Sequence, residues 1–260
     1  PRTCCRSAAR SLKRVSLELG GKSPNIVFED ADLSAAASGV ISGIFAATGQ
    51  TCIAGSRLLV QDEIHDLFME KLLALARTAR MGDPMSPDTQ VGPVTTPPQY
   101  RKVLDYIDVA KKDGAKLVMG GGPATRPECG KGWFVEPTIF DDVTNGMRIA
   151  QEEVFGPVLS VMTFKTLDEA IALANDASYG LSAGIWSENI HTCMEFARRV
   201  QAGTIWTNTW MDGYPEMPFG GFKQSGSGRE LGRYGLDEFL EVKTLTMRVG
   251  RTRSPWVKPV

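Results

Sequence analysis

Cys52 and Glu18 are the two residues whose surroundings best suit them to chemistry on a substrate. Cys52 lies between Gly49 and Gly55 after a predicted helix, so a substrate could approach its sulfur closely. Its backbone N–H could help to hold an oxyanion. Glu18 is followed by paired glycines, which leave the backbone free to turn and the carboxylate free to reach a reacting group. Each residue also has a plainer interpretation, because a lone cysteine is usually buried and structural, and a glutamate before two glycines can simply mark a turn before a strand.

A third segment, Glu152-Glu153-Val154-Phe155-Gly156-Pro157, places a carboxylate and an aromatic ring two residues apart before a predicted strand. Such a pair could bind a ribose and a planar heterocycle. The alternative is a solvated turn that contributes one phenylalanine to the core.

Composition excludes several other classes of protein. The 260 residues are 42% hydrophobic and 23% charged with a formal net charge of -1, which is ordinary for a globular protein and argues against nucleic-acid binding. No apolar run is long enough for a membrane helix, and none near the start predicts a signal peptide. Only two histidines are present, so neither a metal site nor a Ser-His-Asp triad is expected. We expect a cytoplasmic protein whose chemistry comes from Cys, Asp, Glu, Lys or a cofactor.

The elements that must position these residues alternate between strands and helices. Helices of ten or more residues between short apolar strands predict an α/β fold with a mostly parallel sheet covered by helices. Strands are expected at 25–29, 57–61, 116–119, 134–140, 158–164, 183–186 and 204–208, and helices at 33–47, 63–80, 100–112, 167–176 and 190–201.

The last part of the chain differs from the rest. Residues 241–249 (EVKTLTMRV) alternate polar and apolar side chains like a half-exposed strand. An isolated strand there would leave an unpaired edge, so we expect it to add to another sheet, in a neighbouring subunit. The glycine-rich stretch at 225–232 looks like a phosphate loop but does not follow a strand, so we interpret it as a turn leading into this C-terminal arm.

Taken together, the motifs resemble the aldehyde dehydrogenase superfamily from about residue 12 to residue 248. Residues 45–56 (FAATGQTCIAGS) match the family's cysteine pattern, and residues 17–24 (LELGGKSP) match its glutamate pattern. Glu18 and Cys52 are 34 residues apart, as is usual in the family, and EEVFGPV and PFGGFKQSG follow at the expected distances.

The resemblance implies a role for each of four residues. Cys52 would attack the aldehyde carbon, and Glu18 would be the general base that activates water. Glu153 would bind the nicotinamide ribose of NAD or NADP, and Phe155 would pack near the nicotinamide. The substrate would be a small aldehyde, oxidised to a carboxylic acid through a thiohemiacetal and a thioester.

The resemblance also divides the chain. Residues 1–19 would be a remnant of the cofactor-binding domain, residues 20–222 the catalytic domain, and residues 223–260 a return segment whose strand at 241–250 joins subunits of a homo-oligomer. Only the catalytic half of a family member is matched, so we expect this polypeptide by itself to have little dehydrogenase activity. The alternatives are a cofactor-independent thiol esterase, or a non-catalytic fragment that binds full-length subunits.

Substrate identity is suggested by one segment. Residues 206–210 (WTNTW) and the Pro-Glu-Met-Pro that follows are similar to those of betaine-aldehyde and amino-aldehyde dehydrogenases. Trp210 and Tyr214 could therefore face a cation. In the alternative, Trp206 belongs to the core and Trp210 lines an apolar tunnel.

Overall fold

A twisted, mostly parallel sheet forms the centre of the protein. The structure is a computed structural model that describes residues 2–250; residue 1 and residues 251–260, at the ends of the predicted 1–19 and 223–260 segments, lie outside the described residues. Within this range the sheet has seven strands in the order β4-β5-β6-β3-β2-β8-β9, and only the β4–β5 pair is antiparallel. Its strands are β2 (Pro24–Val27), β3 (Arg57–Gln61), β4 (Lys116–Met119), β5 (Thr138–Asp141), β6 (Val158–Phe164), β8 (Ser182–Trp186) and β9 (Thr204–Thr207).

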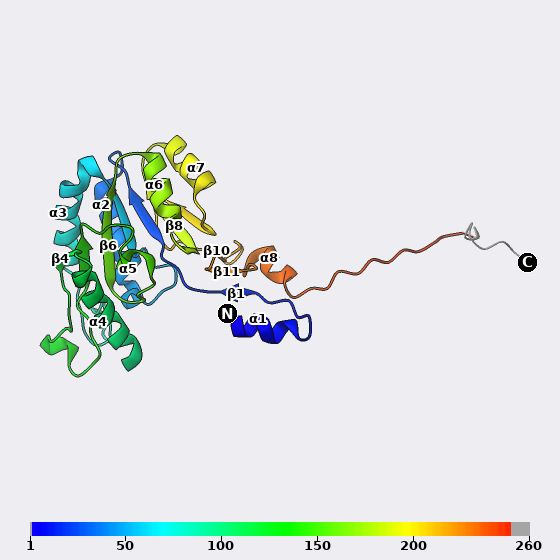
Figure 1. Cartoon of the computed structure of the whole chain (residues 1–260), viewed down its shortest axis with the longest axis horizontal. Helices are drawn as coiled ribbons and strands as arrows, with labels where there is room; N and C mark the ends of the chain where they lie inside the picture. The colour runs from blue at the N-terminus through cyan, green and yellow to red at the C-terminus, as the bar shows by residue number, and fades with distance from the viewer. Residues whose placement is uncertain (1, 251–260) are drawn as a thin grey trace, which may run out of the picture.

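Helices cover both faces of this sheet, as Figure 1 shows. One face is covered by α2 (Leu33–Phe45) and α3 (His65–Ala76). The other is covered by α4 (Pro97–Lys112), α5 (Arg148–Gln151), α6 (Leu167–Asn175) and α7 (Ile190–Arg199). The two remaining helices, α1 (Arg2–Ala9) and α8 (Gly232–Asp237), lie apart from the sheet near the two ends of the chain.

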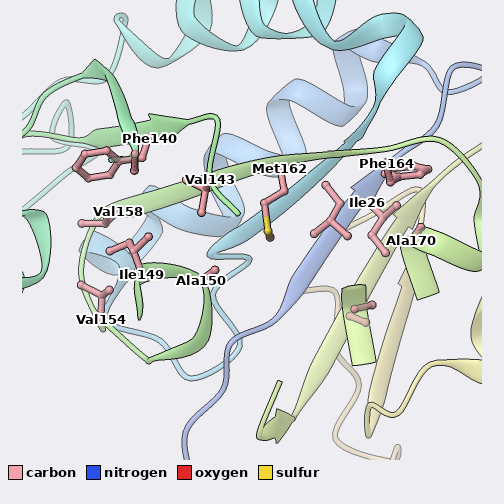
Figure 2. Packing of buried hydrophobic residues seen from close by; sticks show 14 of the residues in the cluster. Ile26, Phe140, Val143, Ile149, Ala150, Val154, Val158, Met162, Phe164 and Ala170 are labelled. Carbon is pink, nitrogen blue, oxygen red and sulfur yellow. The ribbon is translucent and has the colours of Figure 1, made fainter. Parts of the chain in front are cut away.

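Alternation along the strands builds two separate apolar cores. In β2, Ile26 packs under α4–α7 whereas its neighbour Val27 packs under α2 and α3. Because successive side chains of a strand point to opposite faces, a continuous apolar run is what a strand buried on both faces requires. Figure 2 shows the first of these cores, which contains Ile26, Met162 and Phe164 from the strands and Ile149 and Ala150 from α5.

Two small antiparallel pairs lie beside the main sheet. The first joins β1 (Leu17–Glu18) to β11 (Gly226–Ser227), and the second joins β7 (Tyr179–Gly180) to β10 (Phe222–Lys223). The glycine-rich stretch at 225–232 thus forms a short strand and a turn before α8, as its interpretation as a turn predicted.

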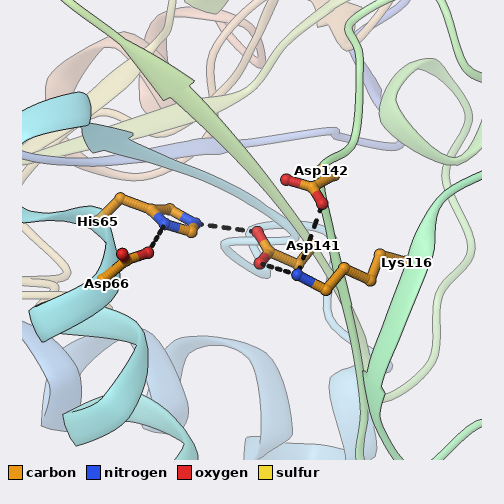
Figure 3. Close-up of polar contacts among 5 residues, drawn as sticks. All are labelled: His65, Asp66, Lys116, Asp141 and Asp142. Carbon is orange, nitrogen blue, oxygen red and sulfur yellow. Dashed lines mark hydrogen bonds and ion pairs between the residues drawn. The ribbon is translucent and has the colours of Figure 1, made fainter.

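The carboxyl end of the sheet is tied to α3 by a polar cluster around Asp141, shown in Figure 3. His65, at the start of α3, lies between Asp66 and Asp141, with Nδ1 2.9 Å from one carboxylate and Nε2 3.0 Å from the other. The ammonium of Lys116 approaches the carboxylates of Asp141 and Asp142 at 3.9 and 3.6 Å. Burial lowers the pKa of His65, but the hydrogen bonds of the two aspartates outweigh it, so the net shift is upward.

Two expected elements begin three or more residues from their predicted start, and several others differ by one to four residues at an end. The predicted strand at 134–140 begins only at Thr138, because Pro137 has no N–H to donate to a neighbouring strand. The helix expected from residue 100 begins at Pro97, capped by the hydroxyl of Thr96, because proline is well tolerated in the first turn of a helix.

The C-terminal segment leaves the body of the protein as an extended chain (Figure 1). Residues 241–249 form no strand within the described chain, and Val242, Leu245, Met247 and Val249 are exposed. A strand requires a backbone partner, and none lies alongside this segment in the described chain. Its addition to another sheet stays a prediction. No helix of the described residues is both long and apolar enough to cross a bilayer.

Candidate active site

The three motifs lie at the same edge of the sheet. The glutamate motif directly precedes β2, the cysteine motif precedes β3, and the Glu153–Phe155 segment precedes β6. These strands are neighbours in the order β6-β3-β2 and run parallel, so their amino ends meet. Segments separated by more than a hundred residues in sequence are therefore brought together.

Glycines allow the motifs to approach one another at backbone distance. A Cβ built on Gly21 would lie 2.4 Å from the carbonyl oxygen of Cys52, and one on Gly20 would lie 2.4 Å from Oε2 of Glu153. Both distances are shorter than any real Cβ contact, so neither position can carry a side chain unless its neighbour moves. The paired glycines Gly20 and Gly21 thus fit between Cys52 and Glu153.

Burial and like charge raise the pKa of both candidate catalytic groups. Glu18 is half-buried, and desolvation raises its pKa first, followed by the charges of Glu230 and Glu153. Its Oε1 is buried and has no hydrogen-bond partner among the described residues. The pKa of the Cys52 thiol is raised by burial and then by the charge of Glu18. The charge of ionised Glu18 therefore makes the Cys52 thiol harder to ionise.

The segment at 225–227 holds Glu18 in place, a role that the sequence did not reveal. Glu18 pairs with Gly226 across β1 and β11. The Ser225 hydroxyl accepts a hydrogen bond from the N–H of Gly180 at 2.9 Å and donates one to the carbonyl of Gly20 at 2.7 Å. A Cβ on Gly226, whose φ is +142°, would lie 2.0 Å from the Leu17 carbonyl. The signal available in the sequence was Ser225 followed by Gly226, a position where a side chain would collide with the Leu17 carbonyl.

Glu152 and Glu153 have different surroundings. Arg148 and Tyr106 both hydrogen-bond Glu152, and Arg148 contributes most to lowering its pKa to about 2. Glu153 forms no ion pair within the described residues, and the N–H of Gly21 donates to its Oε1 at 3.1 Å. Glu152 therefore anchors the loop, whereas Glu153 presents a carboxylate at the site. Next to it, Phe155 has a left-handed backbone with φ of 60°.

A mostly apolar pocket of about 590 Å³ opens beside the cysteine. Ile53, the residue after Cys52, lines it together with Trp206, Met211, Tyr214 and Phe219. Trp210 does not line it; it is 8% exposed and packs against Gly43, Gly55 and Gly184. Trp206 belongs to the core, at 7% exposed, as the alternative expected, and it also lines the pocket. Both expected positions of Trp210 are wrong, because its indole fills the space left by these glycines instead of lining a tunnel or a cation site.

Known sequences identify the family to which this arrangement belongs. The aldehyde dehydrogenase family profile matches residues 2–245. The chain belongs to the aldehyde dehydrogenase family. It is 50% identical over 244 residues to aldehyde dehydrogenase 1A1 of Gallus gallus, covering 94% of this chain and 47% of that protein. It is 47% identical over 238 residues to betaine aldehyde dehydrogenase of Bacillus subtilis (strain 168), covering 92% and 49%.

Solved structures of aldehyde dehydrogenases share the fold. An NAD-dependent aldehyde dehydrogenase from Sinorhizobium meliloti superposes with a TM-score of 0.92 at 50% identity, covering 96% of this chain and 49% of that one. The chain thus spans about half the length of the aldehyde dehydrogenases that it matches here. Among the described residues of this family member, no group of three or more His, Cys, Asp or Glu side chains could hold a metal ion.

Proposed function

We propose that this aldehyde dehydrogenase oxidises an aldehyde to a carboxylic acid with Cys52 as nucleophile and Glu18 as general base. The observation that carries the proposal is the meeting of Glu18, Cys52 and Glu153 at the amino ends of three adjacent parallel strands. The electrostatic coupling of Glu18 and Cys52 supports their division of labour.

The reaction would begin with loss of the thiol proton of Cys52, which Glu18 can accept directly or through water. Glu18 is suited to this because burial raises its pKa toward that of the thiol. The thiolate forms a bond to the aldehyde carbon, and the carbonyl π electrons move to the oxygen, next to the Cys52 N–H. After a hydride has left the carbon, a thioester remains on Cys52. Glu18 first releases the thiol proton to solvent and then removes a proton from water, whose oxygen attacks the thioester carbon. The C–S bond breaks, and the carboxylic acid and the Cys52 thiolate separate.

Glu153 and Phe155 suit part of a dinucleotide site. The Glu153 carboxylate lies over Gly20, where any side chain would collide with it, and it can accept hydrogen bonds from ribose hydroxyls. When bound, NAD or NADP would supply the acceptor for the hydride. We expect the 260-residue polypeptide by itself to oxidise aldehydes slowly, because two residues offer little surface for so large a cofactor.

Hydrolysis of activated esters is the second candidate function. Acyl transfer to Cys52 requires only the thiol, water and Glu18, so it needs no hydride acceptor. The pocket lined by Ile53, the residue after Cys52, supports it, since its mostly apolar wall can hold an acyl chain.

The pocket also bears on the substrate. Trp206 and Phe219 line it, and the carboxylate of Asp212 is hydrogen-bonded by the Thr209 hydroxyl. Tyr214 is 68% exposed at its rim. We favour an apolar aldehyde over a cationic one, because Trp210, proposed as part of a cation site, is packed in the core.

We further propose that residues 241–250 join two copies of this chain. Val242 and Val249 are 95% and 92% exposed, and an extended segment with alternating apolar side chains is stabilised by adding to another sheet. This surface is also what the non-catalytic alternative would use. A cytoplasmic location fits the proposal, because a catalytic thiol must stay reduced.

The experiment combines ester hydrolysis with labelling of the cysteine. The purified chain, C52S and E18Q are assayed with p-nitrophenyl acetate, and iodoacetamide labelling is followed at the Cys52 peptide by mass spectrometry. C5S is the matched control, because Cys5 is exposed on α1 away from the sheet. We expect C52S to abolish turnover, E18Q to reduce it about 100-fold, and C5S to retain it. Turnover that survives C52S would exclude Cys52 as the nucleophile.

NAD titration followed by tryptophan fluorescence distinguishes a dehydrogenase from a cofactor-independent esterase and from a non-catalytic fragment. A saturable change that E153Q weakens supports the cofactor role of Glu153. Failure of C52S, E18Q and E153Q to change any of these signals would leave the non-catalytic alternative.

A further inference from the structure

The turn immediately before Cys52 has an unusual backbone. Ala47, Thr48 and Gly49 all adopt left-handed conformations, with φ of 49°, 58° and 67°. Two of them carry a Cβ, which makes that region unfavourable, so surrounding contacts must hold the turn in shape. A Cβ on Gly49 would lie 2.1 Å from the carbonyl oxygen of Gly156, so the turn also abuts the loop that contains Phe155.

The segment from Gly92 to Thr96 supplies these contacts. The Thr48 hydroxyl donates to the carbonyl of Gly92 at 3.1 Å. Oε1 of Gln50 accepts two hydrogen bonds from Thr95, one from its N–H and one from its hydroxyl, both at 2.9 Å. Gln50, two residues before Cys52, is thus attached to Thr95 by its side chain.

The same segment continues into α4 and holds the other loop. Gln99, in the first turn of α4, donates from Nε2 to the carbonyls of Val154 and Phe155 at 2.9 and 2.8 Å. These carbonyls flank the left-handed Phe155, so Gln99 fixes the backbone at the second strained point of the site. We call residues 92–99 the brace.

We propose that the brace positions the Cys52 turn relative to the Glu153–Phe155 loop, with Gln50, Thr95 and Gln99 as positioning residues for the reaction of Cys52. This inference rests on the proposed function for its catalytic consequence, whereas the orientation and burial of the thiol can be measured without any turnover. The charged groups that act on the thiol are Glu18 and Glu153, and neither belongs to the brace.

Loosening the brace should raise the rate at which Cys52 is alkylated and lower the rate of turnover. The Cys52 thiol is half-buried, and burial is the largest cause of its raised pKa. A looser turn would expose the thiol, so alkylation should become faster and its pH profile should move to lower pH. Turnover should fall, because a displacement of about 1 Å can cost roughly 100-fold in rate. A residue that merely supports the fold would lower stability without moving the pH profile.

The test uses conservative variants of the two ends of the brace. T95V removes the hydroxyl donor to Gln50 and keeps the shape, whereas T95S restores the hydroxyl. Q99M keeps the length of the side chain, adds no charge and removes both donors to the loop. T78V is the matched control, because the Thr78 hydroxyl also donates to a backbone carbonyl, that of Leu75 at 2.7 Å at the end of α3. Circular dichroism and urea unfolding establish that each variant is folded.

We expect T95V and Q99M to alkylate Cys52 several-fold faster below pH 8 and to hydrolyse p-nitrophenyl acetate about 10-fold more slowly, mainly in kcat. T95S and T78V should match the unsubstituted chain, and the T95V/Q99M double variant should be less than additive. Unchanged alkylation profiles in T95V and Q99M, or T95S behaving like T95V, would overturn the proposal. A chain without ester turnover would count against the esterase candidate alone, because the alkylation profiles still decide the role of the brace.

Discussion

Replacing Gly21 by alanine tests the contact between the glutamate motif and the cysteine most directly. The added Cβ would lie 2.4 Å from the carbonyl oxygen of Cys52 and 3.2 Å from Cβ of Leu181. Gly21 has no left-handed φ, so the substitution adds volume without backbone strain. An ordinary contact begins near 3.4 Å, so the Cys52 backbone must move by about 1 Å.

The expected losses of stability and of turnover follow from that displacement. Overpacking of a close contact costs about 1–3 kcal/mol in the free energy of unfolding. A nucleophile moved by about 1 Å loses on the order of 100-fold in rate. We therefore expect G21A to lower stability by about 2 kcal/mol and Cys52-dependent ester turnover by about 100-fold.

Urea denaturation measures the free energy of unfolding, and p-nitrophenyl acetate hydrolysis measures the turnover. G146A is the matched control, because a Cβ on Gly146 meets nothing within 4 Å and its φ is not left-handed. It should leave both quantities unchanged. A G21A protein with the stability and turnover of the unsubstituted chain would refute the close approach of the two motifs, and with it the geometry on which the site depends.

Three further outcomes are expected. E18Q should lower the pKa of Cys52, because the Glu18 charge helps to raise it, so the alkylation profile should move to lower pH; an unmoved profile would contradict the coupling. The raised pKa of His65 means that its protonated form stabilises the fold. This contribution is complete below the unfolded-state value of about 6.5 and is lost as pH rises through the folded-state value, so unfolding free energies between pH 6 and 8 should fall, and H65Q should flatten that dependence. F68A removes a side chain with no exposed surface and should cost about 3–5 kcal/mol in urea denaturation, whereas L12A, at a 92% exposed residue, should cost little.

Much of the fold could be predicted from local pattern. The strands at 57–61, 116–119 and 158–164 have the expected bounds, because short runs with apolar residues between turn residues leave little choice. The largest errors in where an element begins occurred at Pro97 and Pro137, where proline decides the boundary. The order of the strands could not be predicted, since it depends on which strands pair and no local pattern encodes that.

The candidate site was predictable only as a set of motifs. Sequence pattern indicated Glu18, Cys52, Glu153 and Phe155, and their convergence follows from β6, β3 and β2 being neighbours. The partners that hold them were not predictable. Ser225 contacts the glutamate motif from more than two hundred residues away, and the Thr95 contact depends on a loop conformation that no motif announces.

The placement of the motifs before the strands also determines where the protein can be modified. Ligand sites of parallel sheets commonly lie beyond the carboxyl ends of the strands, but here that side carries structural contacts such as the one between Gln61 and the Glu29 backbone. The loops after β2 and β6 therefore offer attachment points for fluorophores or affinity tags remote from the cysteine. A probe placed there could report unfolding and leave the chemistry of the opposite side undisturbed.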